Sequence, residues 1–307
     1  NCKNEGRISK VSDANGVGVA RYLEDNGFDA SEVDSDIKTD MAGGIIGVNL
    51  TNQVIDHCAN SGSLTGFTCL GGVAGFNGGG VFNCELAGNF GNASQDYVGG
   101  IAGLNIKTSS TPLNYKDVKG KEWNSYVPGT IAVCRVNNGV TVTGRNTVGG
   151  IAAYNLSGGV IQDSICIGNI TARGNYAGGI AGRNNGLVFV GEDNYTGKRT
   201  ISGRNGQGIG GLVGCNEVSG SIQMSGNGDV IAVNSGVTVI GGMNVGGLIG
   251  ENKGIFGTAD GILVCRAAEV HALQGNAGGI AGISSKDISY AKNASGQVTA
   301  DNGLAGG

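Results

Sequence analysis

The sequence predicts an all-β fold, a parallel β-solenoid (β-helix) built from about eight to nine repeats of 28–36 residues. Three observations predict it. An anchor of the form Gly-Gly-aliphatic-small-Gly recurs along the chain, an asparagine follows nearly every copy, and a short aliphatic strand that often ends in cysteine comes next. Repeats of this length cannot bury a core alone, so we expect each one to stack on its neighbours.

The composition favours short strands and tight turns. The 307 residues include 62 Gly and only 2 Pro, whereas Gly usually makes up about 7% of a protein. Hydrophobic residues make up 39%, which is enough for a core, and charged residues only 14%. The net charge is −4 and the sequence shows no basic stripe, so we expect no nucleic-acid partner. No apolar run approaches the ~18 residues of a membrane span, so we expect no membrane span either.

The anchor occurs eight times, at spacings of 28, 28, 50, 29, 32, 36 and 32 residues, and Gly306-Gly307 begins a ninth copy. Its third position is always Ile, Val or Leu, and its seventh is Asn except in the last copy, which has Ser284. Stacking places equivalent residues over one another, about 4.8 Å apart. We therefore expect a buried aliphatic column and an axial asparagine ladder, as in cross-β structures. The predicted ladder is Asn49, Asn77, Asn105, Asn155, Asn184, Asn216 and Asn252.

Two other anchor positions indicate where the chain bends and which side chain leaves the core. The Gly pair suits a bend, a positive φ, or a place that tolerates no Cβ. The sixth position varies freely, from Phe76 and Tyr154 to Arg183 and Glu251. We expect this side chain to be free of the core.

Six of the eight cysteines are assigned to one repeat position, in the strand after the anchor. Buried thiols are favoured there because Cys packs as a small hydrophobe. Disulfides between neighbouring coils stay open, with Cys69 and Cys215 as the better candidates because they lie outside the column. The spacings contain no CxxC pair, so we expect no metal site. The predicted cysteine column is Cys58, Cys84, Cys134, Cys166 and Cys265, with Cys2 as its sixth member.

The sequence offers no catalytic residue and no cofactor motif. The only two histidines are His57 and His271, and neither belongs to an HExxH motif. The Gly-x-Gly strings are those expected by chance at this glycine content, so they support no nucleotide site. We expect a chain that is not an enzyme.

The 50-residue spacing contains a loop insertion at about residues 106–129. Insertions in repeat proteins map to loops on one side, often the binding side. The insertion holds the only Trp and two Tyr, and aromatic residues anchor interfaces. We predict that Trp123, Tyr115 and Tyr126 contact a ligand.

Residues 1–40 are predicted to be a partial repeat followed by an irregular insertion, with a short helix at ARYLEDNG. Residues 41–307 are predicted to be solenoid repeats. Both ends fall within a repeat, so we expect a segment of a longer array. Open ends would allow end-to-end self-association.

The pattern GGLVG-x-N, followed by an aliphatic strand and a Gly-Asn turn, resembles the GLUG motif, with its best copies at 210–216 and 246–252. The resemblance spans roughly residues 41–307. It implies a structural or adhesive segment of a bacterial surface or secreted protein, located outside the cell, with a host or matrix protein or glycan as partner. The motif carries no known catalytic residue. Two alternatives stay open: an accessory solenoid region of a secreted metallopeptidase, and a glycan-binding or glycan-active β-helix.

Overall fold

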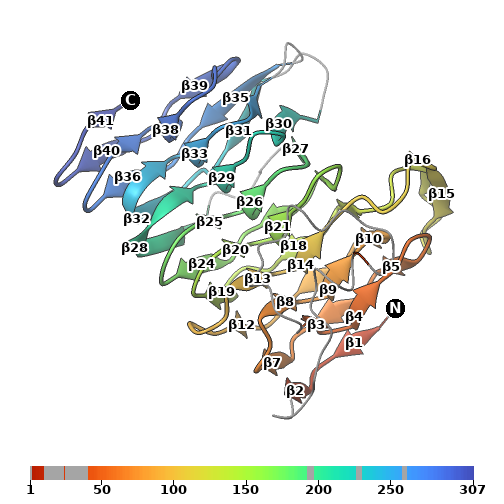
Figure 1. Cartoon of the computed structure of the whole chain (residues 1–307). Coiled ribbons are helices and arrows are strands. Elements are labelled where there is room, and N and C mark those ends of the chain that lie inside the picture. The colour runs from red at the N-terminus through yellow and green to blue at the C-terminus, as the bar shows by residue number, and fades with distance from the viewer. Residues whose placement is uncertain (1, 10–23, 25–40, 192–196, 226–229, 258–260) are drawn as a thin grey trace.

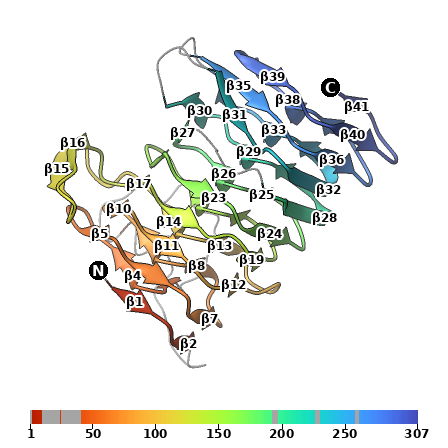
Figure 2. The same ribbon diagram turned by 180° about the vertical axis from the view of Figure 1, so that it is seen from behind.

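A computed structural model describes residues 2–9, 24, 41–191, 197–225, 230–257 and 261–307. These residues form 41 β-strands, and successive turns of the chain stack on one another from the N-terminal to the C-terminal end (Figures 1 and 2). Within the described part, every strand pair is parallel except one hairpin. The parallel β-solenoid predicted from the sequence is confirmed.

The largest sheet has fourteen strands and runs the length of the stack, and a separate two-stranded sheet joins β2 (Arg7–Ser9) to β7 (Ser63–Thr65). The fourteen strands are β3 (Met41–Gly43), β8 (Cys69–Gly71), β12 (Phe90–Gly91), β13 (Tyr97–Gly99), β19 (Thr141–Gly144), β20 (Val148–Gly149), β24 (Asn169–Ala172), β25 (Ala177–Gly178), β28 (Arg199–Gly210), β32 (Val237–Gly246), β36 (Glu269–Ala272), β37 (Ala277–Gly278), β40 (Gln297–Ala300) and β41 (Ala305–Gly306).

Two further sheets take one strand from most coils. The eight-stranded sheet follows the anchor and comprises β4 (Ile46–Asn49), β9 (Ala74–Asn77), β14 (Ala102–Asn105), β21 (Ala152–Asn155), β26 (Ala181–Asn184), β29 (Val213–Asn216), β33 (Ile249–Asn252) and β38 (Ala281–Ser284). The seven-stranded sheet comes next along each coil and comprises β5 (Val54–Asp56), β10 (Gly80–Phe82), β17 (Thr130–Ala132), β22 (Val160–Gln162), β27 (Leu187–Val190), β30 (Ser221–Met224) and β34 (Ile255–Phe256).

Shorter sheets complete the coils. A five-stranded sheet serves the first coils and a three-stranded sheet the last ones, while the antiparallel hairpin of β15 (Leu113–Lys116) and β16 (Glu122–Tyr126) lies within the insertion. The five strands are β1 (Lys3–Asn4), β6 (Ala59–Asn60), β11 (Glu85–Leu86), β18 (Arg135–Val136) and β23 (Ile165–Cys166); the three are β31 (Val230–Val233), β35 (Ile262–Cys265) and β39 (Ala291–Asn293).

The N-terminal residues belong to the stack. Strand β1 pairs with β6, and β2 pairs with β7, so residues 2–9 lie beneath the coil that contains Ala59. The short helix expected at ARYLEDNG lies outside the described residues, apart from the single residue Glu24.

The aliphatic position of the anchor builds the core. Ile101, Ile151 and Ile180 are buried in one apolar cluster. The Ile101 amide donates to the Ile151 carbonyl, and the Ile151 amide to the Ile180 carbonyl, both at 2.9 Å. A Cβ added at Gly100 would overlap the carbonyl oxygen of Gly150 in the next coil. Crowding between coils, rather than a positive φ, is therefore what requires glycine at the anchor.

The asparagines at the seventh position form one line of hydrogen bonds parallel to the solenoid axis. Each Nδ2 donates to the Oδ1 of the asparagine in the next coil, at 2.7–2.9 Å from Asn49 to Asn252, and the line ends on the Ser284 hydroxyl at 3.1 Å. The Asn105 and Asn155 amides also donate to turn carbonyls, those of Gly129 and Gly159. All seven asparagines are buried, so the ladder satisfies polar groups that water cannot reach.

The side chains at the sixth anchor position lie outside the main core, but several of them are buried elsewhere, which the sequence did not predict. Phe76, Leu104 and Tyr154 are buried in a second apolar cluster, together with Cys69 and Tyr97. The cluster fills the angle between the fourteen-stranded and eight-stranded sheets, outside the main core. The side chains at this position change from apolar in the earlier coils to charged in the later ones, so the sequence shows no constant residue type there.

The predicted cysteine column exists in part. Cys58, Cys84 and Cys134 precede strands β6, β11 and β18, which pair in register, so these three residues lie over one another. Each thiol donates to a main-chain carbonyl two residues before it, at 3.2–3.4 Å. Cys2 precedes β1 in the same way but is exposed.

The assignment of Cys166 and Cys265 to this column was wrong. Strand β22 pairs in register with β17, which places Ser164 over Cys134, with the Ser164 Oγ 3.1 Å from the Cys134 amide. Cys166 lies two residues further along and pairs with Val136. Cys265 faces the Gly247 backbone as Cys166 faces Gly150, so these two cysteines share a different position.

All eight cysteines are described, and each is a free thiol. Cys69 lies between Met41 and Tyr97 of the adjacent coils. Cys215 lies between Arg183 and Glu251. Neither has a cysteine above or below it, so their selection as the better disulfide candidates was wrong.

The ladder leads to a prediction for stability. Asn155→Ala removes the acceptor of the Asn105 amide and the donor to Asn184, and both partners are buried. We expect the free energy of unfolding in urea to fall by about 3 kcal/mol. The exposed turn residue Asn138 provides the control, since Asn138→Ala should change it by less than about 0.5 kcal/mol. Equal effects of the two substitutions would contradict the ladder's role.

Candidate functional site

The insertion forms a hairpin that stands on the outer side of the seven-stranded sheet, beside β10 and β5 (Figure 1). Its aromatic side chains pack around Phe82 of β10. The Phe82 ring lies 4.7 Å from Trp123, 5.2 Å from Tyr126 and 5.5 Å from Tyr115, measured between ring centroids. Phe82 is fully buried, so the hairpin covers an apolar patch that the sheet would otherwise expose.

This packing leaves only part of the three predicted contact residues exposed to a ligand. Tyr126 is buried, whereas Trp123 and Tyr115 are half-buried. The Lys121 ammonium lies 3.8 Å from the centroid of the Trp123 ring. The structure thus brings the three aromatic residues together on Phe82, and ligand contact by them stays a prediction.

A polar cluster fixes the hairpin to the solenoid. The Asp56 carboxylate, at the end of β5, accepts from the Asn83 side chain at 2.9 Å and from the Val118 amide at 3.3 Å. It also lies 2.6 Å from His57 Nδ1. On the hairpin side, Asp117 accepts from Asn83 at 3.3 Å. Asn83 therefore joins a solenoid carboxylate to a hairpin carboxylate.

The two carboxyl groups of this cluster titrate at low pH. Burial alone would raise the pKa of Asp56, but hydrogen bonds from Asn83, Tyr115, Val118 and His57 hold it below its usual value of 3.8. Burial likewise opposes the lowering of the Asp117 pKa, which arises mainly from the amides of Lys121 and Lys119. Both groups are ionised at neutral pH and hold their hydrogen bonds as acceptors.

A second polar cluster continues the outer column in the later coils. Arg183 donates to Glu217 at 2.8 Å, and Lys253 lies 3.7 Å from Glu217, 3.6 Å from Glu251 and 3.5 Å from the Cys215 sulfur. Burial, followed by the charge of Glu217, raises the pKa of the Cys215 thiol to about 12. A protonated thiol is a poor nucleophile. Arg183, Cys215 and Glu251 belong to successive paired strands, so the contacts of this cluster join neighbouring coils.

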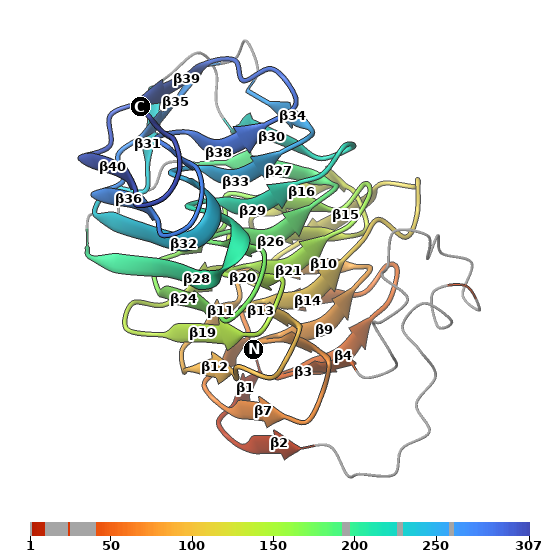
Figure 3. The same cartoon turned by 60° about the vertical axis from the view of Figure 1, so that its left-hand side comes forward.

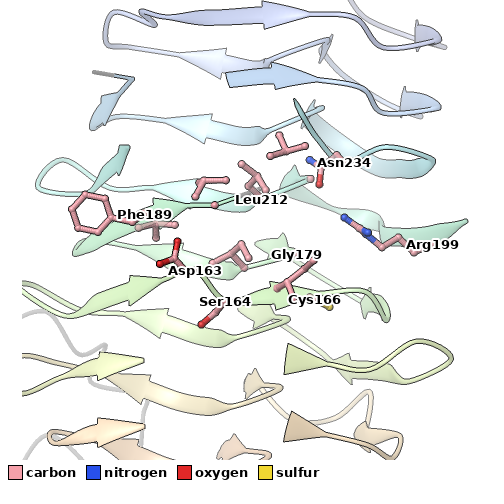
Figure 4. Close-up of a pocket in the computed structure, with 15 residues that line it drawn as sticks. Asp163, Ser164, Cys166, Gly179, Phe189, Arg199, Leu212 and Asn234 are labelled. Carbon is pink, nitrogen blue, oxygen red and sulfur yellow. The ribbon is translucent and has the colours of Figure 1, made fainter. Parts of the chain in front are cut away.

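A cavity of about 170 Å³ lies in the interior where the five-stranded sheet ends at β23 (Figure 4). Arg199 and Asn234 lie on one side of it and Phe189 and Asp163 on the other. Residues 192–196, which join two of the lining segments, lie outside the described part of the chain.

Metal-ligand clusters and membrane-spanning helices are both absent from the described residues. The described residues contain no set of three or more His, Cys, Asp or Glu side chains placed to hold one metal ion. Among the same residues, no helix has the length and apolar character that a membrane crossing requires.

Sequence reasoning missed Phe82, Asn83 and Asp117 as the groups that seat the hairpin. One signal was available in the sequence. The coil directly before the insertion has the aromatic residue Phe82 at the position where the next coil has Ala132.

Comparisons with known proteins give no match. No family model matches this chain, and no curated protein or solved structure matches it either.

The polar cluster predicts how hairpin docking depends on pH. The folded-state pKa of Asp56 is lowered, so its contribution is complete above 3.8 and is lost as the pH falls through the lower folded value. Fluorescence of Trp123, the only tryptophan, reports docking. We expect the emission to stay constant from pH 7 to 5 and to shift to the red only below pH 3.8.

The matching variant is Asp56→Ala, which should be red-shifted already at pH 7 because Asn83 and Val118 lose their acceptor. Asp163→Ala is the control, since that carboxylate instead accepts from Ser225 in another coil. An unshifted spectrum of Asp56→Ala at pH 7 would rule out this account of docking.

Proposed function

We propose that the chain is a non-catalytic structural and adhesive solenoid, a segment of a bacterial cell-surface or secreted protein. The observation that carries the proposal is the unbroken ladder from Asn49 to Ser284, which holds every coil in register with the next. A scaffold of this kind keeps a surface element in a fixed position. The hairpin of β15 and β16 is such an element.

The packing of the polar groups supports a scaffold role. The ionisable cluster around Arg183 and Glu217 is internally paired. The Cys84 and Cys134 thiols also donate to main-chain carbonyls of the preceding coil, those of Ile55 and Val81, at 3.8 and 3.5 Å. These groups are engaged in holding the coils, and their chemistry is accounted for by that role.

Resemblance supports the proposed location. The copies at 210–216 and 246–252 carry the GLUG-like pattern, and both end in equivalent strands, β29 and β33. The repeats of that family belong to surface proteins, so we propose that this chain acts outside the cell. A host or matrix protein or glycan is the proposed partner.

The hairpin is the proposed contact surface on the side of the seven-stranded sheet. Trp123 and Tyr115 remain partly exposed, and Val118 at the turn is 64% exposed. Rigid aromatic groups of this kind provide contact area at a small cost in side-chain entropy. Docking on Phe82 holds them in place before a ligand arrives.

A replacement variant tests the hairpin. Gly78–Gly79 links the equivalent strands β9 and β10 in the preceding coil, so a Gly-Gly pair should replace residues 106–129 without disturbing the stack. Phe82→Ser is added because the replacement uncovers Phe82. Binding to arrayed extracellular-matrix proteins and polysaccharides should fall about 30-fold.

The control is Val218→Ser, a substitution at an exposed turn of another coil, which should leave binding unchanged. Binding that survives the hairpin replacement would contradict the hairpin as the contact surface. Hydrolysis of any arrayed polysaccharide or protein by the purified chain would contradict the non-catalytic role.

A further inference from the structure

The outer face of the fourteen-stranded sheet carries arginines at one repeated position. Strands β19, β24 and β28 pair so that Thr143 lies beside Thr171, and Thr171 beside Ser202. An exposed arginine follows two residues after each of these, on the same face of the strand. The arginine row consists of Arg145, Arg173 and Arg204.

The row is not visible as a run of basic residues in the sequence. The three arginines are 28 and 31 residues apart in the sequence, but stacking brings successive members to about one coil rise, ~4.8 Å. Main-chain hydrogen bonds confirm that the Arg145 and Arg173 turns are adjacent, since the Arg173 amide donates to Gly144 and the Gly174 amide to Arg145, at 3.1 and 2.7 Å. Arg204 is placed beside Arg173 by the pairing of Thr171 with Ser202, two residues earlier in each strand.

The charge of the row is only partly balanced. Arg145 donates through Nε to Asp96 at 2.7 Å and makes a second contact with the same carboxylate. Among the described residues, no carboxylate forms an ion pair with Arg173 or Arg204. Like charges on directly opposed strands destabilise a sheet, so the row carries a cost that a bound polyanion would remove.

Small polar side chains lie beside the row. The outward positions of the three strands carry hydroxyl or amide groups, which donate and accept hydrogen bonds but bear no charge. They are half-buried or exposed, and they form two further rows parallel to the arginines, along the stack shown at the left of Figure 3. These residues are Thr141, Thr143, Asn169, Thr171, Thr200 and Ser202.

We propose that the arginine row and the hydroxyl rows beside it bind a linear acidic polysaccharide that lies along the solenoid axis. The guanidinium groups pair with its carboxylates or sulfates, for which the planar fork of arginine is suited. The threonines, serine and asparagine exchange hydrogen bonds with its hydroxyl groups. The inference rests on the proposed adhesive role and assigns a ligand class to a face on the other side of the stack from the hairpin.

The composition of the face favours a polysaccharide over a nucleic acid. Binding of single-stranded nucleic acid relies on aromatic side chains on which bases stack. The outward positions of β19, β24 and β28, from Thr141 to Arg145 and their equivalents, contain no aromatic residue. Hydroxyl groups dominate these positions instead, which suits the many hydroxyls of a sugar chain.

The test compares two double variants of the full chain. Arg173→Gln with Arg204→Gln removes the two arginines without an ion-pair partner. Arg135→Gln with Arg266→Gln is the matched control, because these arginines are also exposed but belong to other sheets: Arg135 lies in β18 and Arg266 follows β35. The probes are heparin, polygalacturonate, neutral dextran and an oligothymidylate strand, with affinity measured by titration calorimetry.

We expect wild-type protein to bind heparin or polygalacturonate but not dextran, and the Arg173/Arg204 variant to bind about tenfold more weakly. The control should bind as wild type. The Arg173/Arg204 variant should melt at the same or a higher temperature, because like charges are removed, which separates lost binding from lost fold.

Three results would overturn the inference: no binding of either acidic polysaccharide, equal weakening in both variants, or tighter binding of oligothymidylate than of the polysaccharides. Each of these results would leave the proposed adhesive role untouched, because that role is tested separately by the hairpin replacement. Loss of array binding on hairpin replacement, with acidic polysaccharide binding unchanged, would support two separate contact faces.

Discussion

Each coil of this solenoid is held over the next by a line of buried asparagine side chains, and the other columns depend on that register. Because an amide has both donors and an acceptor, one side chain can bond upward, downward and sideways to a turn carbonyl. The Asn105 amide does all three, with Asn77, Asn155 and Gly129. A slip by one residue would leave buried amides without partners, so the ladder fixes where every aliphatic, thiol and glycine position falls.

Register explains why the same face can carry different chemistry in different coils. The outer column begins as an apolar cluster around Phe76 and Leu104 and becomes a charged cluster around Arg183 and Glu217. The backbone is the same in both, so the side chains at one repeat position can change without altering the fold. This freedom is what allows a stack of near-identical coils to hold a docked hairpin on one side and an arginine row on another.

The diglycine spacing was sufficient to predict the fold, because anchors from Gly43 to Gly306 pair in register throughout. The columns between anchors were harder to predict, since the connecting turns differ in length. Its place at the end of an aliphatic strand assigned Cys166 to the wrong column, whereas strand pairing assigns that place to Ser164. The arginines escaped notice for the same reason: they precede their anchors by a different number of residues in each coil, and align only when counted from the paired strands. Packing of the insertion on Phe82 required contacts between distant residues that no local pattern encodes.

The central claim, that equivalent residues lie directly over one another, is open to a direct distance measurement. Nitroxide labels would be placed at Thr141 and Gln297, which are joined by five successive in-register pairings. The background would carry Cys2→Ser, because Cys2 is exposed and the other seven cysteines are buried. Pulsed electron resonance should give a single narrow distribution near 24 Å, about five coil rises of ~4.8 Å. A broad distribution, or one centred beyond about 40 Å, would show that the coils do not stack in this register.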